Sequence, residues 1–123
     1  MNKKYALITG ACSGLGKAFA QQCAKRGFHL ILLDIPGSST SSIACHLTAR
    51  YKVEAHVFEF DLTDTFKMLH HLKIISERFP VSFIINNAGI GGTSSITDTS
   101  LARIEQIIAL YIKSMAMLTR IFI

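Results

Sequence analysis

The sequence predicts an α/β protein in which a parallel sheet is covered by helices on both faces. Short, continuous apolar runs alternate along the chain with segments of helical periodicity. A glycine-rich turn also joins the first apolar run to the first helical segment. Strands buried on both faces are typically continuous apolar runs, and such strands are usually parallel and connected by helices.

The first expected elements surround the glycine-rich turn. Residues 5–8 predict a buried strand, and residues 17–26 predict a helix that ends at Gly27. A second apolar strand is expected over residues 28–33, and it ends at Asp34. A Pro-Gly-Ser sequence then breaks the chain before the next helix.

The remaining elements continue the same alternation. We expect a helix over 40–51, capped by Thr40 or Ser41, and then a strand over 53–60. Residues 61–64 hold the cap of the next helix, which runs to about Phe79. A strand over 81–85, a loop over 91–95 and a helix over 100–122 follow. The core-facing positions of the third helix are Leu69, Leu72, Ile75 and Phe79. Right-handed crossovers then give about four strands in the order 3-2-1-4.

Composition is that of a globular protein with one core. Half of the 123 residues are apolar and no linker or repeat is evident, so residues 1–123 are assigned to one domain. The net charge is +5, but the Lys and Arg residues are scattered singly, which argues against a nucleic-acid partner. The apolar stretch 104–123 is interrupted by Glu105, Lys113 and Arg120, and is not interpreted as a membrane span.

The cysteines and the N-terminal residues bear on compartment and metal binding. Cys12, Cys23 and Cys45 are odd in number and lack metal-ligand spacing, so we interpret them as reduced thiols. Thr9 interrupts the first apolar run too early for a signal peptide. We therefore expect a cytoplasmic protein without a metal centre.

The glycine-rich turn, T-G-A-C-S-G-L-G over residues 9–16, predicts a nucleotide site. Glycines let the backbone turn sharply and approach a pyrophosphate, and the following helix N-terminus offers N–H groups and a positive dipole end. A Mg²⁺-dependent phosphate-binding loop is excluded, because Ala18 follows Gly16-Lys17 and carries no hydroxyl to bind the metal.

Asp34 indicates which nucleotide is bound. It closes the second strand, 20 residues after Gly14. A carboxylate there accepts hydrogen bonds from both hydroxyls of an adenosine ribose and repels a 2′-phosphate. No Arg or Lys follows closely to attract that phosphate. The sequence therefore predicts NAD as the cofactor rather than NADP.

Three motifs, in order, resemble those of the short-chain dehydrogenase/reductase family: the turn over 9–16 as T-G-x-x-x-G-x-G, Asp61-Leu62 after the third strand, and Asn86-Asn87-Ala88-Gly89 after the fourth. The resemblance implies a Rossmann-type fold and hydride transfer between NAD(H) and an alcohol or carbonyl substrate. Together, the turn, the ribose carboxylate and the resemblance give the candidate cofactor-binding residues as Gly10, Ser13, Gly14, Leu15, Gly16, Asp34, Asp61, Leu62, Asn87, Ala88 and Gly89.

The catalytic residues of that family have no counterpart here. Its members use a Ser and a Y-x-x-x-K pair, but none of Tyr5, Tyr51 and Tyr111 has Lys four positions later. Tyr111 also occupies the position in the last helix where the family usually has Asn. We therefore expect the N-terminal, cofactor-binding half of such an enzyme, truncated before the fifth strand and inactive alone.

The last helix suggests self-association. Its apolar residues form two stripes, and only one of them is needed to cover the sheet. One stripe is Leu101, Ile104, Ile108, Tyr111, Met115, Leu118 and Phe122, and the other is Ile107, Leu110, Met117 and Ile121. In the family this helix commonly packs against its copy, and the fourth strand would be an open sheet edge. We expect a homodimer or larger assembly through the helix, the strand edge or both. One alternative function is a non-catalytic NAD-binding or assembly module. A second is a SAM-dependent methyltransferase, and the Asn-Asn-Ala-Gly motif argues against it.

Overall fold

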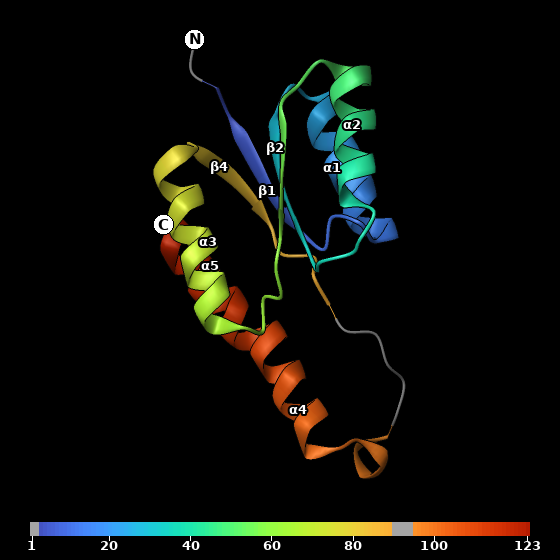
Figure 1. The fold of residues 1–123 in the computed structure, drawn as a ribbon, viewed down its shortest axis with the longest axis vertical. Helices are drawn as coiled ribbons and strands as arrows, with labels where there is room; N and C mark the ends of the chain where they lie inside the picture. The colour runs from blue at the N-terminus through green and yellow to red at the C-terminus, as the bar shows by residue number, and fades with distance from the viewer. Residues whose placement is uncertain (1–2, 90–94) are drawn as a thin grey trace.

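The computed structural model describes residues 3–89 and 95–123, so the expected loop over 91–95 lies outside these residues except for Ser95. All strand pairs are parallel, and the strand order is β3-β2-β1-β4, as predicted. The strands are β1 (Tyr5–Thr9), β2 (His29–Asp34), β3 (Ala55–Glu59) and β4 (Val81–Ile85). The fold class predicted from the sequence is therefore confirmed (Figure 1).

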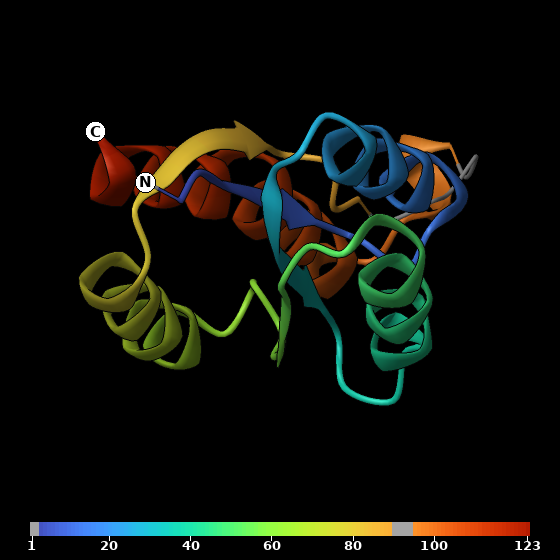
Figure 2. The same ribbon diagram turned by 90° about the horizontal axis from the view of Figure 1, so that it is seen from above.

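Helices cover both faces of this sheet (Figures 1 and 2). Helices α1 (Gly14–Lys25) and α2 (Thr40–Tyr51) pack on one face, and α3 (Thr65–Arg78) and α5 (Met115–Phe122) pack on the other. A short 3₁₀ helix (Ile96–Asp98), α4 (Leu101–Ile108) and a π-helical turn (Ala109–Ser114) lead into α5. None of the described helices is long and apolar enough to cross a membrane.

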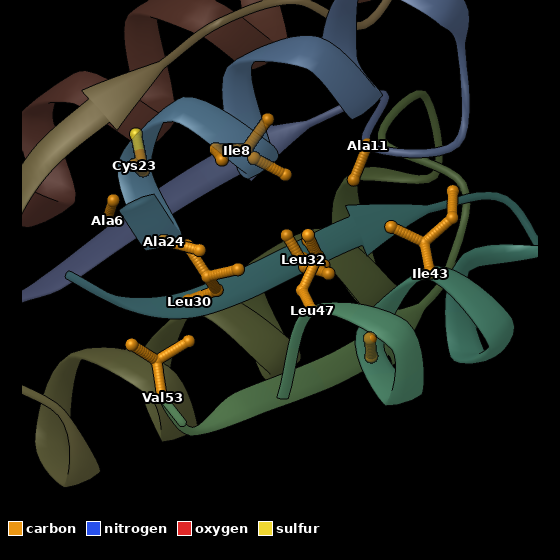
Figure 3. Close-up of a cluster of buried hydrophobic side chains, with 12 residues drawn as sticks. Ala6, Ile8, Ala11, Cys23, Ala24, Leu30, Leu32, Ile43, Leu47 and Val53 are labelled. Carbon is orange, nitrogen blue, oxygen red and sulfur yellow. The ribbon is translucent and has the colours of Figure 1, made fainter. Parts of the chain in front are cut away.

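Alternate side chains of the two central strands enter separate cores. Ile8 of β1 and Leu32 of β2 belong to one core with residues of α1 and α2, and Figure 3 shows both among the side chains of this cluster. Leu7 of β1 and Ile31 of β2 face the opposite side and pack against α3 and α5. The central strands are therefore buried on both faces, which explains their unbroken apolar sequences.

The buried face of α3 differs from the prediction at one position. Leu69 was expected to face the core but is 40% exposed, and Met68 is fully buried instead. Asp64 is the N-cap, with its carboxylate accepting a hydrogen bond from the Lys67 N–H at 3.2 Å. From this start, Met68 lies one helical turn before Leu72 on the same face, so the inward stripe runs through 68 and 72 rather than 69.

The last helix is not a uniform α-helix. A π-helical turn over Ala109–Ser114 widens it between α4 and α5. Leu110, Ser114 and Leu118, spaced four residues apart, are buried, whereas Tyr111 and Met115 are 42% and 36% exposed. The two stripes expected from a regular helix are therefore mixed: Leu118 packs on the sheet while Tyr111 and Met115 do not. The cause is the changed residue count per turn.

Candidate cofactor-binding site

A cavity of about 740 Å³ lies at the carboxyl ends of the strands. The segments that follow all four strands contribute to its wall, and the last helix closes one side. Eight of the eleven candidate residues line it: Gly10, Ser13, Asp34, Asp61, Leu62, Asn87, Ala88 and Gly89. In a parallel sheet this edge is where ligands bind, at the point where the strand order reverses.

The glycine-rich turn is held by the carbonyl oxygen of Gly10. That oxygen accepts hydrogen bonds from the Ser13 N–H at 3.2 Å, the Ser13 hydroxyl at 2.9 Å and the Asn87 amide at 3.1 Å. Gly10 has φ +65°, a left-handed conformation that side chains disfavour. A Cβ on Gly16 would lie 2.0 Å from the same oxygen. Two of the glycines are therefore required by the backbone itself.

Asp34 is fixed at the cavity wall by two backbone N–H groups. One carboxylate oxygen accepts from Cys12 N–H at 2.7 Å, and the other accepts from Ile35 N–H at 2.7 Å. The side chain is half-buried and lines the cavity. Each carboxylate oxygen offers more than one acceptor site, so both keep capacity for a ligand hydroxyl.

Thr9 links the ends of β1 and β4. Its hydroxyl oxygen accepts hydrogen bonds from the Asn87 and Ala88 N–H groups, both at 2.9 Å, and its side chain is almost fully buried. The Asn87 amide nitrogen also donates to the Ser13 hydroxyl at 3.0 Å. The Thr9 hydroxyl and the Asn87 amide thus hold the loop after β4 against the glycine-rich turn.

The loop after β3 is also ordered by its own side chains. Asp61 accepts hydrogen bonds from the N–H and the hydroxyl of Thr63, at 2.9 and 2.7 Å. Phe60 is buried, with its ring stacked on His71 at 4.5 Å between centroids. Asp61 and Leu62 therefore line the cavity next to Asp34, because β3 neighbours β2 in the sheet.

Three candidate residues lie outside the cavity wall. Gly14, Leu15 and Gly16 form the first turn of α1, and Leu15 is 62% exposed. Their expected contacts with the cofactor stay predictions. Gly16 is nevertheless buried where the helix meets the turn, so its packing role is independent of any ligand.

The last helix supplies a part of the cavity wall that was not predicted from the sequence. These residues of the last helix are Arg103, Gln106, Leu110 and Tyr111. Other lining residues that were not predicted are Cys12, Leu33, Ile35, Ser38, Phe60 and Thr63. The spacing of 103, 106 and 110 is that of one helix face and was available as a signal. This spacing was not interpreted as part of the site, because the apolar residues of the helix were expected to cover the sheet and to contact another subunit.

The clearest electrostatic cluster lies at the opposite, amino end of the sheet. Hydrogen bonds from Lys3 and His56 lower the pKa of Glu54 from 4.5 to about 2. The Tyr5 hydroxyl donates to the same carboxylate at 3.0 Å. These groups link residues next to β1 and β3 and are remote from the cavity.

The described residues include no group of His, Cys, Asp and Glu able to hold a metal ion.

A parallel sheet of this order, with a glycine turn, a fixed carboxylate and a cavity at the switch point, defines a dinucleotide-binding Rossmann-type domain. The family model described as short chain dehydrogenase matches residues 4–123. The chain therefore belongs to the short-chain dehydrogenase/reductase family, whose solved members include structures with bound NADPH.

Among curated relatives, the chain is 37% identical over 89 residues to the very-long-chain 3-oxoacyl-CoA reductase of Vanderwaltozyma polyspora, covering 72% of this chain and 26% of that one. It is 38% identical over 87 residues to the enzyme of the same name from Scheffersomyces stipitis, covering 70% and 25%. The chain thus spans about a quarter of the length of these relatives.

Two solved structures are similar over nearly the whole chain. A bulky-bulky ketone specific alcohol dehydrogenase from Comamonas testosteroni superposes with a TM-score of 0.91 at 27% identity, covering 99% of this chain and 49% of its own. A short-chain dehydrogenase from Sphingobium yanoikuyae in complex with NADPH gives 0.90 at 26%, covering 97% and 46%. The chain corresponds to about half of each.

Proposed function

We propose that this chain is the nicotinamide-dinucleotide-binding part of a short-chain dehydrogenase/reductase and that it prefers NAD(H) to NADP(H). The observation that carries the proposal is the Asp34 carboxylate, which two N–H groups hold at the cavity wall next to the glycine-rich turn. In that place it accepts from both hydroxyls of the adenosine ribose and repels a 2′-phosphate.

The test is calorimetric titration with NADH and with NADPH. Asp34→Asn keeps the side-chain size, removes the charge and replaces one of the two acceptor oxygens with an NH₂ donor. Hydrogen bonds to charged groups are worth about 1.5–3 kcal/mol, so the NADH affinity should fall roughly 10-fold or more while the preference over NADPH is lost. Glu77→Gln, which neutralises an exposed carboxylate on α3, is the matched control. Equal affinity for the two cofactors in the unaltered chain would contradict the proposal.

We further propose that these 123 residues bind the cofactor without turning it over. The sequence contains no Y-x-x-x-K pair, and the tyrosine that lines the cavity, Tyr111, is followed four residues later by Met115. A placed general acid typically contributes about 10²–10⁴-fold in rate. NADH oxidation should therefore stay at background with ketones and with 3-oxoacyl-CoA thioesters, the substrate class named for the curated relatives. Steady turnover at ordinary enzyme rates would refute this, whereas binding without turnover also fits a cofactor-sensing module.

We also propose self-association through the last helix. Leu101, Ile108 and Ile112 are 82%, 49% and 63% exposed along its outer side. Burying large apolar side chains contributes about 1.5–3 kcal/mol each, enough to favour a second copy of the same helix. Light scattering should give twice the chain mass at micromolar concentration, and Ile112→Lys should give the monomer. Phe66→Lys, at an exposed position on α3, should leave the mass unchanged; a monomeric unaltered chain would refute the proposal.

A further inference from the structure

The phenol of Tyr111 fills the space next to Gly89 at the β4 end of the cavity. A Cβ built on Gly89 would lie 2.6 Å from the Tyr111 hydroxyl oxygen and 3.3 Å from Cζ. Both residues line the cavity, and the Tyr111 side chain is 42% exposed. A polar group from the last helix therefore reaches the backbone of the loop that follows β4, beside Asn87 and Ala88.

The π-helical turn accounts for this direction. Leu110 and Ser114, which flank Tyr111 in this turn, are buried and face the rest of the molecule. The Ser114 hydroxyl donates to the Leu110 carbonyl oxygen inside the turn. With the turn anchored on both sides of it, Tyr111 is presented to the cavity edge. Single π-helical turns within α-helices occur frequently at functional sites.

The order of the strands indicates which part of a dinucleotide passes Tyr111. Asp34 and Asp61 follow β2 and β3, so they mark the adenosine half. The diphosphate belongs at the turn after β1, around Gly10 and the start of α1. Since β4 lies on the other side of β1, the second ribose is directed past the loop after β4. Gly89 and Tyr111 line the cavity at that end.

We infer that the Tyr111 hydroxyl is a binding group for the second, nicotinamide-side ribose, and that Gly89 is required so that this hydroxyl can stay in place. The inference rests on the dinucleotide function proposed above. It concerns a position where the family resemblance implies Asn, so the contact is a feature of this chain. It also predicts a separable contribution, because ADP-ribose differs from ADP only by the second ribose.

The experiment titrates the chain with ADP, ADP-ribose and NADH. Tyr111→Phe removes only the hydroxyl. A hydrogen bond contributes about 0.5–1.5 kcal/mol net, so ADP-ribose and NADH should bind about 3- to 10-fold more weakly while ADP affinity stays within about twofold. Tyr51→Phe is the control, since the Tyr51 hydroxyl bonds to Gln21 and Arg50 outside the cavity.

A double-mutant cycle tests the role of Gly89. Gly89→Ala should weaken ADP-ribose in the Tyr111 chain, because the new methyl displaces the hydroxyl. It should add little in the Tyr111→Phe chain, where the nearest ring carbon is 3.3 Å away. A purely structural defect would weaken ADP and ADP-ribose alike.

The outcomes separate this inference from the proposed function. If the unaltered chain binds all three ligands but Tyr111→Phe leaves them unchanged, or weakens ADP equally, the inference is overturned and the dinucleotide function stands. If the folded, unaltered chain binds neither ADP nor NADH at millimolar concentration, both are overturned.

Discussion

Gly16→Ala should damage the glycine-rich turn in a way that the structure quantifies. The added Cβ would lie 2.0 Å from the Gly10 carbonyl oxygen, whereas ordinary contacts begin at 3.4 Å, so α1 and the turn must separate by about 1.4 Å. The displaced oxygen holds three hydrogen bonds, from two groups of Ser13 and from Asn87. Overpacking costs about 1–3 kcal/mol, and the loss of one or two of these bonds costs about 1 kcal/mol each. We expect the free energy of unfolding to fall by about 2–5 kcal/mol.

Gly14→Ala provides a matched control within the same motif. A Cβ on Gly14 meets no atom within 4 Å, and the residue begins α1. An alanine that fits the native backbone typically stabilises by about 0.4–1 kcal/mol by restricting the unfolded chain. The two substitutions are chemically identical and two residues apart, yet they should change stability in opposite directions.

Urea unfolding followed by far-ultraviolet circular dichroism measures both variants, and calorimetry with NADH reports whether the turn still binds. Gly16→Ala should lose at least about 10-fold in NADH affinity, because the turn that faces the diphosphate has moved. If the two variants unfold at the same urea concentration, the close approach of Gly16 to Gly10 is not what this motif requires.

Three further predictions concern other parts of the molecule. Thr9→Val strands two N–H groups of the loop after β4 and should cost about 2–4 kcal/mol in urea unfolding, whereas Thr9→Ser should not. Leu118→Ala should cost about 2–5 kcal/mol, and Phe66→Ala, at an exposed position on α3, within about 0.5 kcal/mol; equal losses would contradict the packing of α5. Since the folded pKa of Glu54 is about 2 against 4.5, its carboxylate stabilises above pH 4.5 and ceases to as pH falls to about 2. Its side chain is 35% exposed, so Glu54→Gln should cost only roughly 1 kcal/mol at pH 7, and most of that cost should be gone at pH 2; a pH-independent loss would refute this.

Much of the fold could be predicted from residues that begin or end helices and strands. The fourth strand was predicted at its observed bounds, 81–85, because Pro80 precedes it and an Asn-Asn pair follows. The start of α1 was placed at residue 17 rather than Gly14, since two glycines are poor helix formers. The Ser13 hydroxyl, which accepts from the Gly16 N–H at 3.4 Å, and packing against the turn outweigh that propensity.

The candidate site could be predicted where it depends on topology. The segments after parallel strands meet at one sheet edge, so Asp34, Asp61 and Asn87 converge whatever the details of packing. Arg103 and Gln106 precede the π-helical turn, and their spacing was a readable signal. The direction of Tyr111 depends on that turn, because a change in residues per turn rotates every later side chain. The sequence pattern of Tyr111 and Met115 fits a regular helix equally well, so no periodicity argument could have found their exposure.

The Asp34 carboxylate connects cofactor preference to the stability of the turn. The oxygen that accepts from the Cys12 N–H fastens the glycine-rich turn to the end of β2, and the same side chain faces the expected ribose. Replacing Asp34 by a small or basic residue to admit a 2′-phosphate would therefore leave a part-buried N–H without its acceptor, at about 1–3 kcal/mol. A change of cofactor preference that keeps the turn intact consequently needs a second acceptor for the Cys12 N–H, and not only a positive charge for the phosphate.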